Sequence, residues 1–210
     1  MDKTLANTST ESRQQTTLLD GVIARNRFTD QIEVTVMAAP AFIFRAFDEV
    51  MPSDMPVAAL IGFIRYLPAR LLGKGQPAPP TSQSFIQGIK SAGWVTLAEA
   101  PDSELVFGGA GKYHQFVDQE PACFSDRADF FTFSDPSYQK LAISVRVEPG
   151  AKSGENRLIM EHRTQPLSEH SRRQFARYWL VIKPMGAFVS RQLLLAVKKR
   201  AERSAREAVN

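Results

Sequence analysis

Apolar residues recur every three or four positions along the C-terminal part of the chain, residues 168–208. This spacing predicts one long amphipathic helix, whose apolar face must be buried against a broad apolar surface. Because Pro184 lacks an N–H donor and clashes with the preceding turn, we expect a kink or break at residues 183–186. The predicted buried stripe consists of Phe175, Tyr178, Trp179, Ile182, Val189, Leu193, Ala196 and Val197.

Nearer the N-terminus, residues 31–37 alternate between apolar and polar positions, which predicts a strand with one buried face. A short helix is predicted from Pro40 to Met51, and a second from Ser53 or Asp54 onward. Residues 73–84 are rich in Gly and Pro and should form an irregular connection. The buried set of the second helix would be Ala59, Leu60, Phe63, Ile64 and Leu67.

Beyond this connection, short strand-like segments alternate with turn residues, a pattern typical of successive hairpins in an antiparallel sheet. The glycines at 108, 109 and 111 lie within such segments, where they often mark a bulge, so we expect the sheet to bend there. The six predicted strands are residues 93–99, 104–108, 112–118, 128–134, 139–148 and 156–165. In the fifth, Leu141, Ile143, Val145 and Val147 share one face, and Lys140, Ser144, Arg146 and Glu148 the other.

Together these elements predict an α+β fold: a curved antiparallel sheet of about seven strands that grips the long C-terminal helix, with two short helices after the first strand. Residues 29–208 are expected to form this single domain. Residues 1–28 are expected to be a flexible N-terminal tail with room for a short helix.

The composition is that of a soluble globular protein, with 43% hydrophobic and 23% charged residues, and the 14 Phe suggest an aromatic-lined interior. The single cysteine, Cys123, can form no intramolecular disulfide, which fits a reducing compartment. The polar N-terminus lacks the apolar core of a signal peptide. We therefore expect a cytoplasmic protein.

The net charge of +4 is concentrated at the C-terminus, where residues 168–210 carry ten Lys/Arg and three acidic residues. The basic tail consists of Lys198, Lys199, Arg200, Arg203 and Arg206, and no large apolar residue follows Val197 until Val209. The tail therefore lacks an apolar face for insertion, and we expect a solvated helix end with at most weak electrostatic contact with an anionic membrane. No nucleic-acid partner is expected.

Three stretches carry a resemblance to a known superfamily: GAGKYHQ at 109–115, MEHRTQP at 160–166 and FARYWLVIKPMGAFVSRQLL at 175–194. With the predicted element order, they make the chain resemble a bacterial branch of the START-like or helix-grip (SRPBCC) superfamily, which includes polyketide cyclases and lipid-transfer proteins. The resemblance covers about residues 29–206. It implies a sheet that grips the C-terminal helix over an apolar cavity, and it assigns no catalytic residue.

Catalytic and metal-binding motifs are absent from the sequence. His114, His162 and His170 are scattered singly, which predicts no metal site. No G-x-S-x-G elbow surrounds any serine, and residues 108–112 lack the glycine spacing of a phosphate loop. No cofactor is expected.

Candidate ligand contacts come from the last strand and the long helix. Glu161 and Arg163 are two apart in a strand, so they share one face, opposite His162. If their face meets the cavity, they could anchor a ligand; the alternative is an ion pair on an open sheet face. Tyr178 and Trp179 could line the cavity wall or simply pack in the core. The predicted ligand-binding residues are Lys112, His114, Glu161, Arg163, Tyr178 and Trp179.

The predicted function is binding of an apolar or lipid-like small molecule in a cavity between the sheet and the C-terminal helix. The alternative is an enzyme of the cyclase or dehydratase kind that uses the same cavity, with Glu161, His114 and Tyr178 as candidate acids or bases. An ionisable side chain that points into the cavity with a displaced pKa would favour the enzyme.

Overall fold

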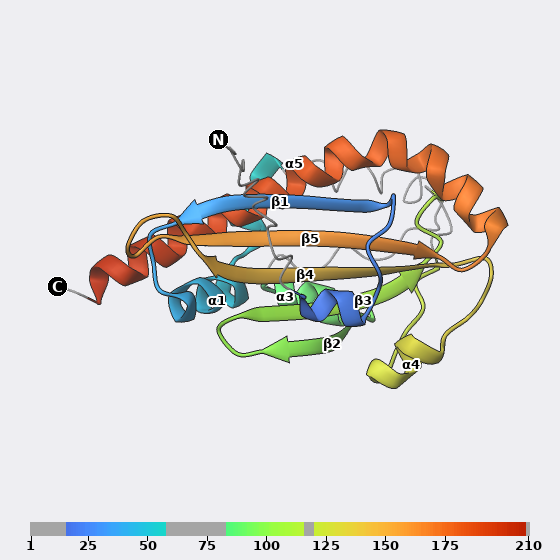
Figure 1. Ribbon diagram of the computed structural model, residues 1–210, viewed down its shortest axis with the longest axis horizontal. Helices are drawn as coiled ribbons and strands as arrows, with labels where there is room; N and C mark the ends of the chain where they lie inside the picture. The colour runs from blue at the N-terminus through green and yellow to red at the C-terminus, as the bar shows by residue number, and fades with distance from the viewer. Residues whose placement is uncertain (1–15, 58–82, 116–119, 209–210) are drawn as a thin grey trace, which may run out of the picture.

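The computed structural model describes residues 16–57, 83–115 and 120–208. Within these ranges the chain forms one open antiparallel sheet of five strands, in the spatial order β1-β5-β4-β3-β2 (Figure 1). The strands are β1 Thr29–Val36, β2 Val95–Ala100, β3 Glu104–Gly111, β4 Gln139–Pro149 and β5 Asn156–Pro166. The helices are η1 Leu18–Gly21, α1 Pro40–Glu49, η2 Pro52–Asp54, α3 Phe85–Ser91, α4 Arg127–Thr132 and α5 Glu169–Glu207.

Strands β2 to β5 follow one another as neighbours, whereas β1 pairs with the last strand, β5. The register of that pair runs from Thr29 opposite Arg163 to Val36 opposite Asn156. The α+β architecture with one antiparallel sheet and a long C-terminal helix is therefore as the sequence predicts.

One face of the sheet is covered by α1, α3 and α5, and the main core lies between them. Helix α5 packs against β1, β5 and α1 (Figure 1). On β4, the apolar face predicted from the alternation contributes Val145 to this core. The largest core residues include Phe47, Phe107, Leu158, Met160, Leu193 and Leu194.

The opposite face of the sheet is covered in part by η1 and α4. The N-terminal segment, expected as a tail, contributes η1 to this layer, and Leu19 and Ile23 are buried there with Phe130. Because of this cover, Lys140 and Ser144 on the polar face of β4 are buried as well. The sheet is thus sandwiched, at its centre, between two layers.

The strand count of about seven is wrong, since the described residues contain five strands. Of the predicted strand 128–134, residues 128–132 belong instead to helix α4, because the Asp126 carboxylate caps it by accepting hydrogen bonds from the N–H groups of Ala128 and Asp129 at 2.7 and 3.0 Å. Of the predicted strand 112–118, residues 112–115 form a turn after β3, and residues 116–119 lie outside the described residues.

The glycines of β3 mark no bulge, because β3 keeps a regular register with β4 through Gly111. The irregularity lies in β2, between Thr96 and Ala98. At Gly108 a Cβ atom would lie 2.6 Å from Leu97 Cδ1 and 3.0 Å from Phe130 Cε2. The missing side chain therefore makes room for neighbours on the η1 and α4 side.

The sequence predicts a kink or break at residues 183–186. Helix α5 is continuous through Pro184, so no break occurs there, and Figure 1 shows that the helix bends along its length. One lost hydrogen bond is tolerated because tertiary packing holds the helix on both sides of Pro184, with Phe175 and Leu193 buried. Of the predicted stripe, Val197 is also buried, and Tyr178, Trp179, Ile182, Val189 and Ala196 are half-buried. The predicted second helix, with its buried set 59–67, lies outside the described residues.

Candidate functional site

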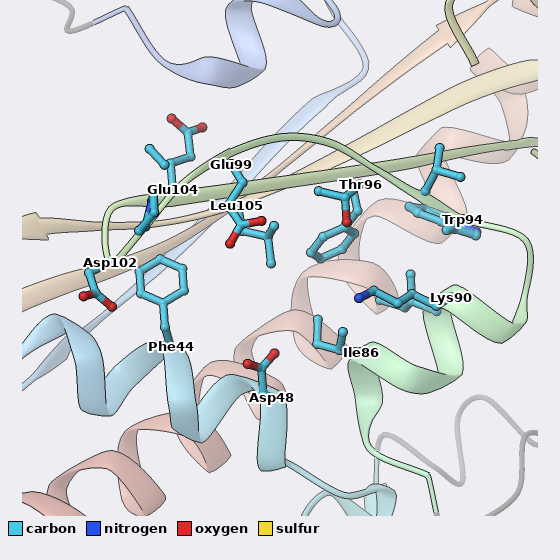
Figure 2. Close-up of a pocket in the computed structure, with 15 residues that line it drawn as sticks. Phe44, Asp48, Ile86, Lys90, Trp94, Thr96, Glu99, Asp102, Glu104 and Leu105 are labelled. Atoms are coloured by element: carbon cyan, nitrogen blue, oxygen red, sulfur yellow. The ribbon is translucent and has the colours of Figure 1, made fainter. Parts of the chain in front are cut away.

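A cleft of about 280 Å³ lies between the edge of the sheet formed by β2 and β3 and the helices α1 and α3 (Figure 2). This volume is close to the lower end of the range for small-molecule sites. Its apolar walls consist of Phe44, Ile86, Ile89, Trp94, Leu105 and Phe107, and no residue of α5 lines it.

Local sequence explains how the α3 side of the cleft is built. Ser84 caps α3, because its hydroxyl accepts a hydrogen bond from the Gln87 N–H at 3.4 Å while the Gln87 side chain accepts one from the Ser84 N–H at 3.3 Å. Gly93, with φ of 83°, turns the chain from α3 into β2. The turn places Trp94 immediately before β2.

The Trp94 ring is held between β3 side chains and backbone. Its centroid lies 6.4 Å from that of Phe107. A Cβ atom on Gly109 would lie 2.8 Å from Trp94 Nε1, so only glycine leaves space for the indole at this position. Trp94 thus forms a fixed aromatic wall of the cleft.

Charged side chains from three elements surround the opening. Asp48 comes from α1, Lys90 from α3 and Glu99 from β2, and Figure 2 shows all three extending into the space between strands and helices. Asp102 lines the cleft from the β2–β3 turn. We call Asp48, Glu99 and Asp102 the acidic rim.

Glu104 also borders the cleft, but its carboxylate points to the opposite face of the sheet. There it accepts hydrogen bonds from Ser144 Oγ at 2.6 Å and from the Leu18 N–H at 2.8 Å. Glu104 therefore anchors η1 and does not contribute its charge to the acidic rim.

Burial and neighbouring charges change the ionisation of Asp48. Partial burial raises the pKa of this carboxyl above its usual value, the ammonium of Lys90 acts against this, and the charges of Glu99 and Glu49 raise the pKa further. In the described part of the chain, no carboxylate lies within salt-bridge distance of Lys90. The arrangement can attract a cationic group, and Asp48 can take up or release a proton.

None of the six residues predicted to bind a ligand lines this cleft. Glu161 and Arg163 lie on the sheet face opposite α5, under the N-terminal segment. Glu161 accepts hydrogen bonds from Arg163 Nε at 2.9 Å and from an Arg146 terminal nitrogen at 3.0 Å. Arg163 also donates to Asp20 Oδ1 at 2.7 Å and to the Ile23 carbonyl at 2.8 Å. Their face is therefore neither open nor turned toward α5.

Tyr178 and Trp179 lie on the other side of the sheet, in an aromatic cluster at the start of α5. The Phe28 ring lies 5.0 Å from Phe175 and 6.1 Å from Trp179, centroid to centroid. Tyr178 lies 5.7 Å from Phe175. The cluster attaches the end of the N-terminal segment to α5.

Lys112 and His114 lie in the turn after β3. Lys112 Nζ is 2.6 Å from Glu120 Oε2 and lies over the Tyr138 ring at 5.4 Å. His114 Nδ1 is 3.3 Å from Gln139 Oε1. The structure thus distributes the six predicted residues over three separate places, and their role in ligand binding stays a prediction.

Sequence reasoning missed the residues that build the cleft. Asp48, Lys90 and Glu99 lie on three different elements, so no local spacing relates them. Trp94 follows Gly93 at the beginning of the predicted strand 93–99, but the helix that precedes it, α3, is not among the predicted elements. Within the described residues, no three His, Cys, Asp or Glu side chains group as metal ligands.

The chain matches no protein-family model, no curated protein and no solved structure with which it was compared. Its relation to the START-like superfamily stays a prediction from the sequence resemblance.

Proposed function

We propose that the protein binds a small molecule with an apolar body and a cationic or hydrogen-bond-donating group in the cleft between β2, β3, α1 and α3. The observation that carries this proposal is the apolar wall of Trp94 and Phe107 beneath the acidic rim. Small-molecule sites commonly combine a mostly apolar lining with a few polar groups that fix orientation.

The negative charge of the acidic rim determines which polar group the ligand can carry. Three carboxylates, Asp48, Glu99 and Asp102, surround one ammonium, Lys90. Their summed field favours an amine and disfavours a carboxylate such as that of a fatty acid. The cleft volume of about 280 Å³ also suits a compact ligand better than a long acyl chain.

The proposed binding site differs from the cavity predicted between the sheet and the C-terminal helix, although the fold class is the expected one. In a helix-grip arrangement the five strands would hold α5, with the ligand cavity between them. Here α5 buries Leu193, Leu194 and Val197 against the sheet, and the cleft opens beside α1 and α3 instead. A cytoplasmic location stays a prediction.

A second candidate function, an enzyme of the cyclase or dehydratase kind, is favoured by one observation. The carboxyl group of Asp48, with a raised pKa, faces the same space as Lys90. Partial burial makes this carboxyl group hold its proton more readily, and a positioned carboxylic acid can donate and recover one proton during a reaction. Asp48 would then be the acid or base in place of Glu161, His114 or Tyr178.

A matched pair of ligands tests the binding proposal: 2-(1-naphthyl)ethylamine and 1-naphthylacetate, which share an aromatic body and differ in charge. The readout is the fluorescence of Trp94 in a Trp179→Phe background. We expect the amine to bind more tightly, and Asp48→Asn with Glu99→Gln to remove that preference. Phe131→Gln, on α4, is the control. Equal affinity for both ligands, or no effect of the double substitution, would overturn the proposal.

Native mass spectrometry of the purified protein distinguishes a protein that only binds its ligand from an enzyme that converts it. A co-purified molecule that stays unchanged on incubation supports binding alone. A mass change that wild-type protein produces and Asp48→Asn does not would support the enzyme.

A further inference from the structure

The outward face of α5 exposes large apolar side chains. Leu180, Val181, Phe188 and Leu195 are 79%, 62%, 39% and 38% exposed. Val181, Phe188 and Leu195 are spaced by seven positions, two helical turns, so they lie on one line along the helix. We call these four residues the outer α5 face.

Basic residues lie at both ends of this face and beside it. Arg177, Arg191 and Lys199 are exposed, and Arg177 and Lys199 lie about three turns to either side of Phe188. No Asp or Glu occurs between residues 170 and 201. Among the described residues, no carboxylate lies within salt-bridge distance of these three cations. The surface thus combines apolar and positive groups, which is the combination that anionic lipid surfaces attract.

The packing of α5 against the sheet determines whether the helix can cross a bilayer or only lie on its surface. By length and composition, an 18-residue window of α5 could cross a membrane, and 22% of that window is buried. However, the opposite side of α5 packs Leu193, Leu194 and Val197 into the core. Crossing would strip these residues from the sheet and would place Arg191 in hydrocarbon. The helix can therefore lie on a membrane surface without unfolding the domain, but it cannot span one.

We propose that the outer α5 face docks on an anionic lipid bilayer, with α5 parallel to the surface. Leu180, Val181 and Phe188 enter the boundary between headgroups and acyl chains, and Arg177, Arg191 and Lys199 contact the headgroup phosphates. The apolar residues of this surface precede the basic tail, which shares Lys199 with the surface and has no large apolar residue before Val209. They supply the insertion that the tail cannot. The inference does not depend on what the cleft binds.

A second copy of the chain fits this face less well. In a two-fold symmetric contact centred on Phe188, Arg177 of one copy would approach Lys199 of the other, because both lie about three turns from the centre. Like charges across an apolar contact oppose association. Charge therefore favours the lipid surface.

Co-sedimentation of the full chain with vesicles tests the proposal. The vesicles are phosphatidylcholine alone, and phosphatidylcholine with about one third phosphatidylglycerol. We expect binding to the mixed vesicles that weakens at high salt but persists. The apolar side chains are tested by the triple variant Leu180→Gln/Val181→Gln/Phe188→Gln. At high salt this variant should bind the mixed vesicles about tenfold more weakly than wild type, because the inserted apolar area is lost. Phe131→Gln, which removes a similarly exposed Phe from the other side of the molecule, should bind like wild type.

The charges are tested by Arg177→Gln/Arg191→Gln/Lys199→Gln. We expect a loss of about tenfold or more at low salt, since each basic residue near the surface adds to the attraction. The control Arg45→Gln/Arg127→Gln/Lys152→Gln removes the same charge elsewhere and should lose less. Circular dichroism verifies that each variant is folded.

Three outcomes would overturn the proposal. They are equal binding to both vesicle types, equal losses in the two charge variants, and a dimer in lipid-free sedimentation that the Leu180→Gln/Val181→Gln/Phe188→Gln variant dissociates. The last would assign the face to a second copy of the chain.

Discussion

Arg163 and Glu161, two positions apart on β5, are joined by a hydrogen bond of 2.9 Å, and each is only 2% exposed. The same guanidinium reaches Asp20, so this pair connects the centre of the sheet to the N-terminal segment. A backbone hydrogen bond from Thr17, with help from Arg163, lowers the pKa of Asp20. The pair therefore stabilises the layer that covers this side of the sheet.

Removing one partner of this buried pair should be costly. Arg163→Met leaves the Glu161 carboxylate buried with one cation fewer, and we expect the free energy of unfolding to fall by about 3 kcal/mol or more. Glu161→Leu/Arg163→Met should cost less than the sum of the single substitutions. Urea unfolding measures both. The control is Arg157→Met, in the exposed pair with Glu33, where a loss of about 0–1 kcal/mol is expected. Similar losses in the two arginine variants would contradict this account.

The stability should depend on pH through His162. Burial lowers the pKa of this imidazole to about 4, against the opposing charge of Glu161, and Ser190 Oγ lies 3.4 Å from its Nε2. Because the unfolded state takes up a proton near pH 6.5 and the folded state does not, stability should fall as the pH drops from about 6.5 to 4, by about 3 kcal/mol. Chemical unfolding across this range measures the slope, which His162→Asn should flatten. An unchanged slope in that variant would refute the assignment, and exposed His170→Gln is the control.

Two glycine-to-alanine substitutions should change the free energy of unfolding in opposite directions. Gly108→Ala would push a methyl group into Leu97 and Phe130, and we expect a loss of about 1–3 kcal/mol. Gly186→Ala, within α5, meets no atom within 4 Å and should gain about 0.5–1 kcal/mol through helix propensity. Thermal and urea unfolding of both variants measure these changes in stability. A Gly108→Ala variant more stable than wild type would contradict the expectation and show unfilled space beside β3.

The pKa of Asp48 should respond to its two charged neighbours in opposite directions. Lys90→Gln removes a charge that lowers this pKa and should raise it, whereas Glu99→Gln should lower it. Titration of the Asp48 side-chain carbonyl by carbon-13 NMR measures the shifts. Glu148→Gln, away from the cleft, should leave the pKa unchanged. A shift of the same sign in both cleft variants would rule out direct electrostatic coupling.

Strand β4 shows what periodicity can predict, because the predicted apolar face faces the main core: Ile143 and Val145 are buried in it, and Leu141 and Val147 are partly buried against it. Helix α4 shows where prediction from sequence pattern fails. Phe130, Phe131 and Phe133 suggest a strand by composition, but the Asp126 cap selects a helix in which Phe130 is buried and Phe131 is 40% exposed. A cap is a local contact that a test for alternation does not detect.

The cleft could not be predicted by the same reasoning. Asp48, Lys90 and Glu99 meet only because α1, α3 and β2 pack around one sheet edge. Likewise, alternation placed Glu161 and Arg163 on a common face, but the cover of that face depends on residues about 140 positions earlier, at Asp20 and Ile23. Long-range packing of this kind leaves no periodic signal.

The pairing of β1 with β5 sets the order in which the sheet can be completed during synthesis. As the chain leaves the ribosome, the strand that carries Ile32 and Val34 emerges early, yet its partner begins only at Asn156. The β2–β3 and β4–β5 pairs have short connections and close locally, so they can form first. A nascent or truncated chain that stops before residue 156 therefore presents an unpaired β1, an edge open to association with other chains.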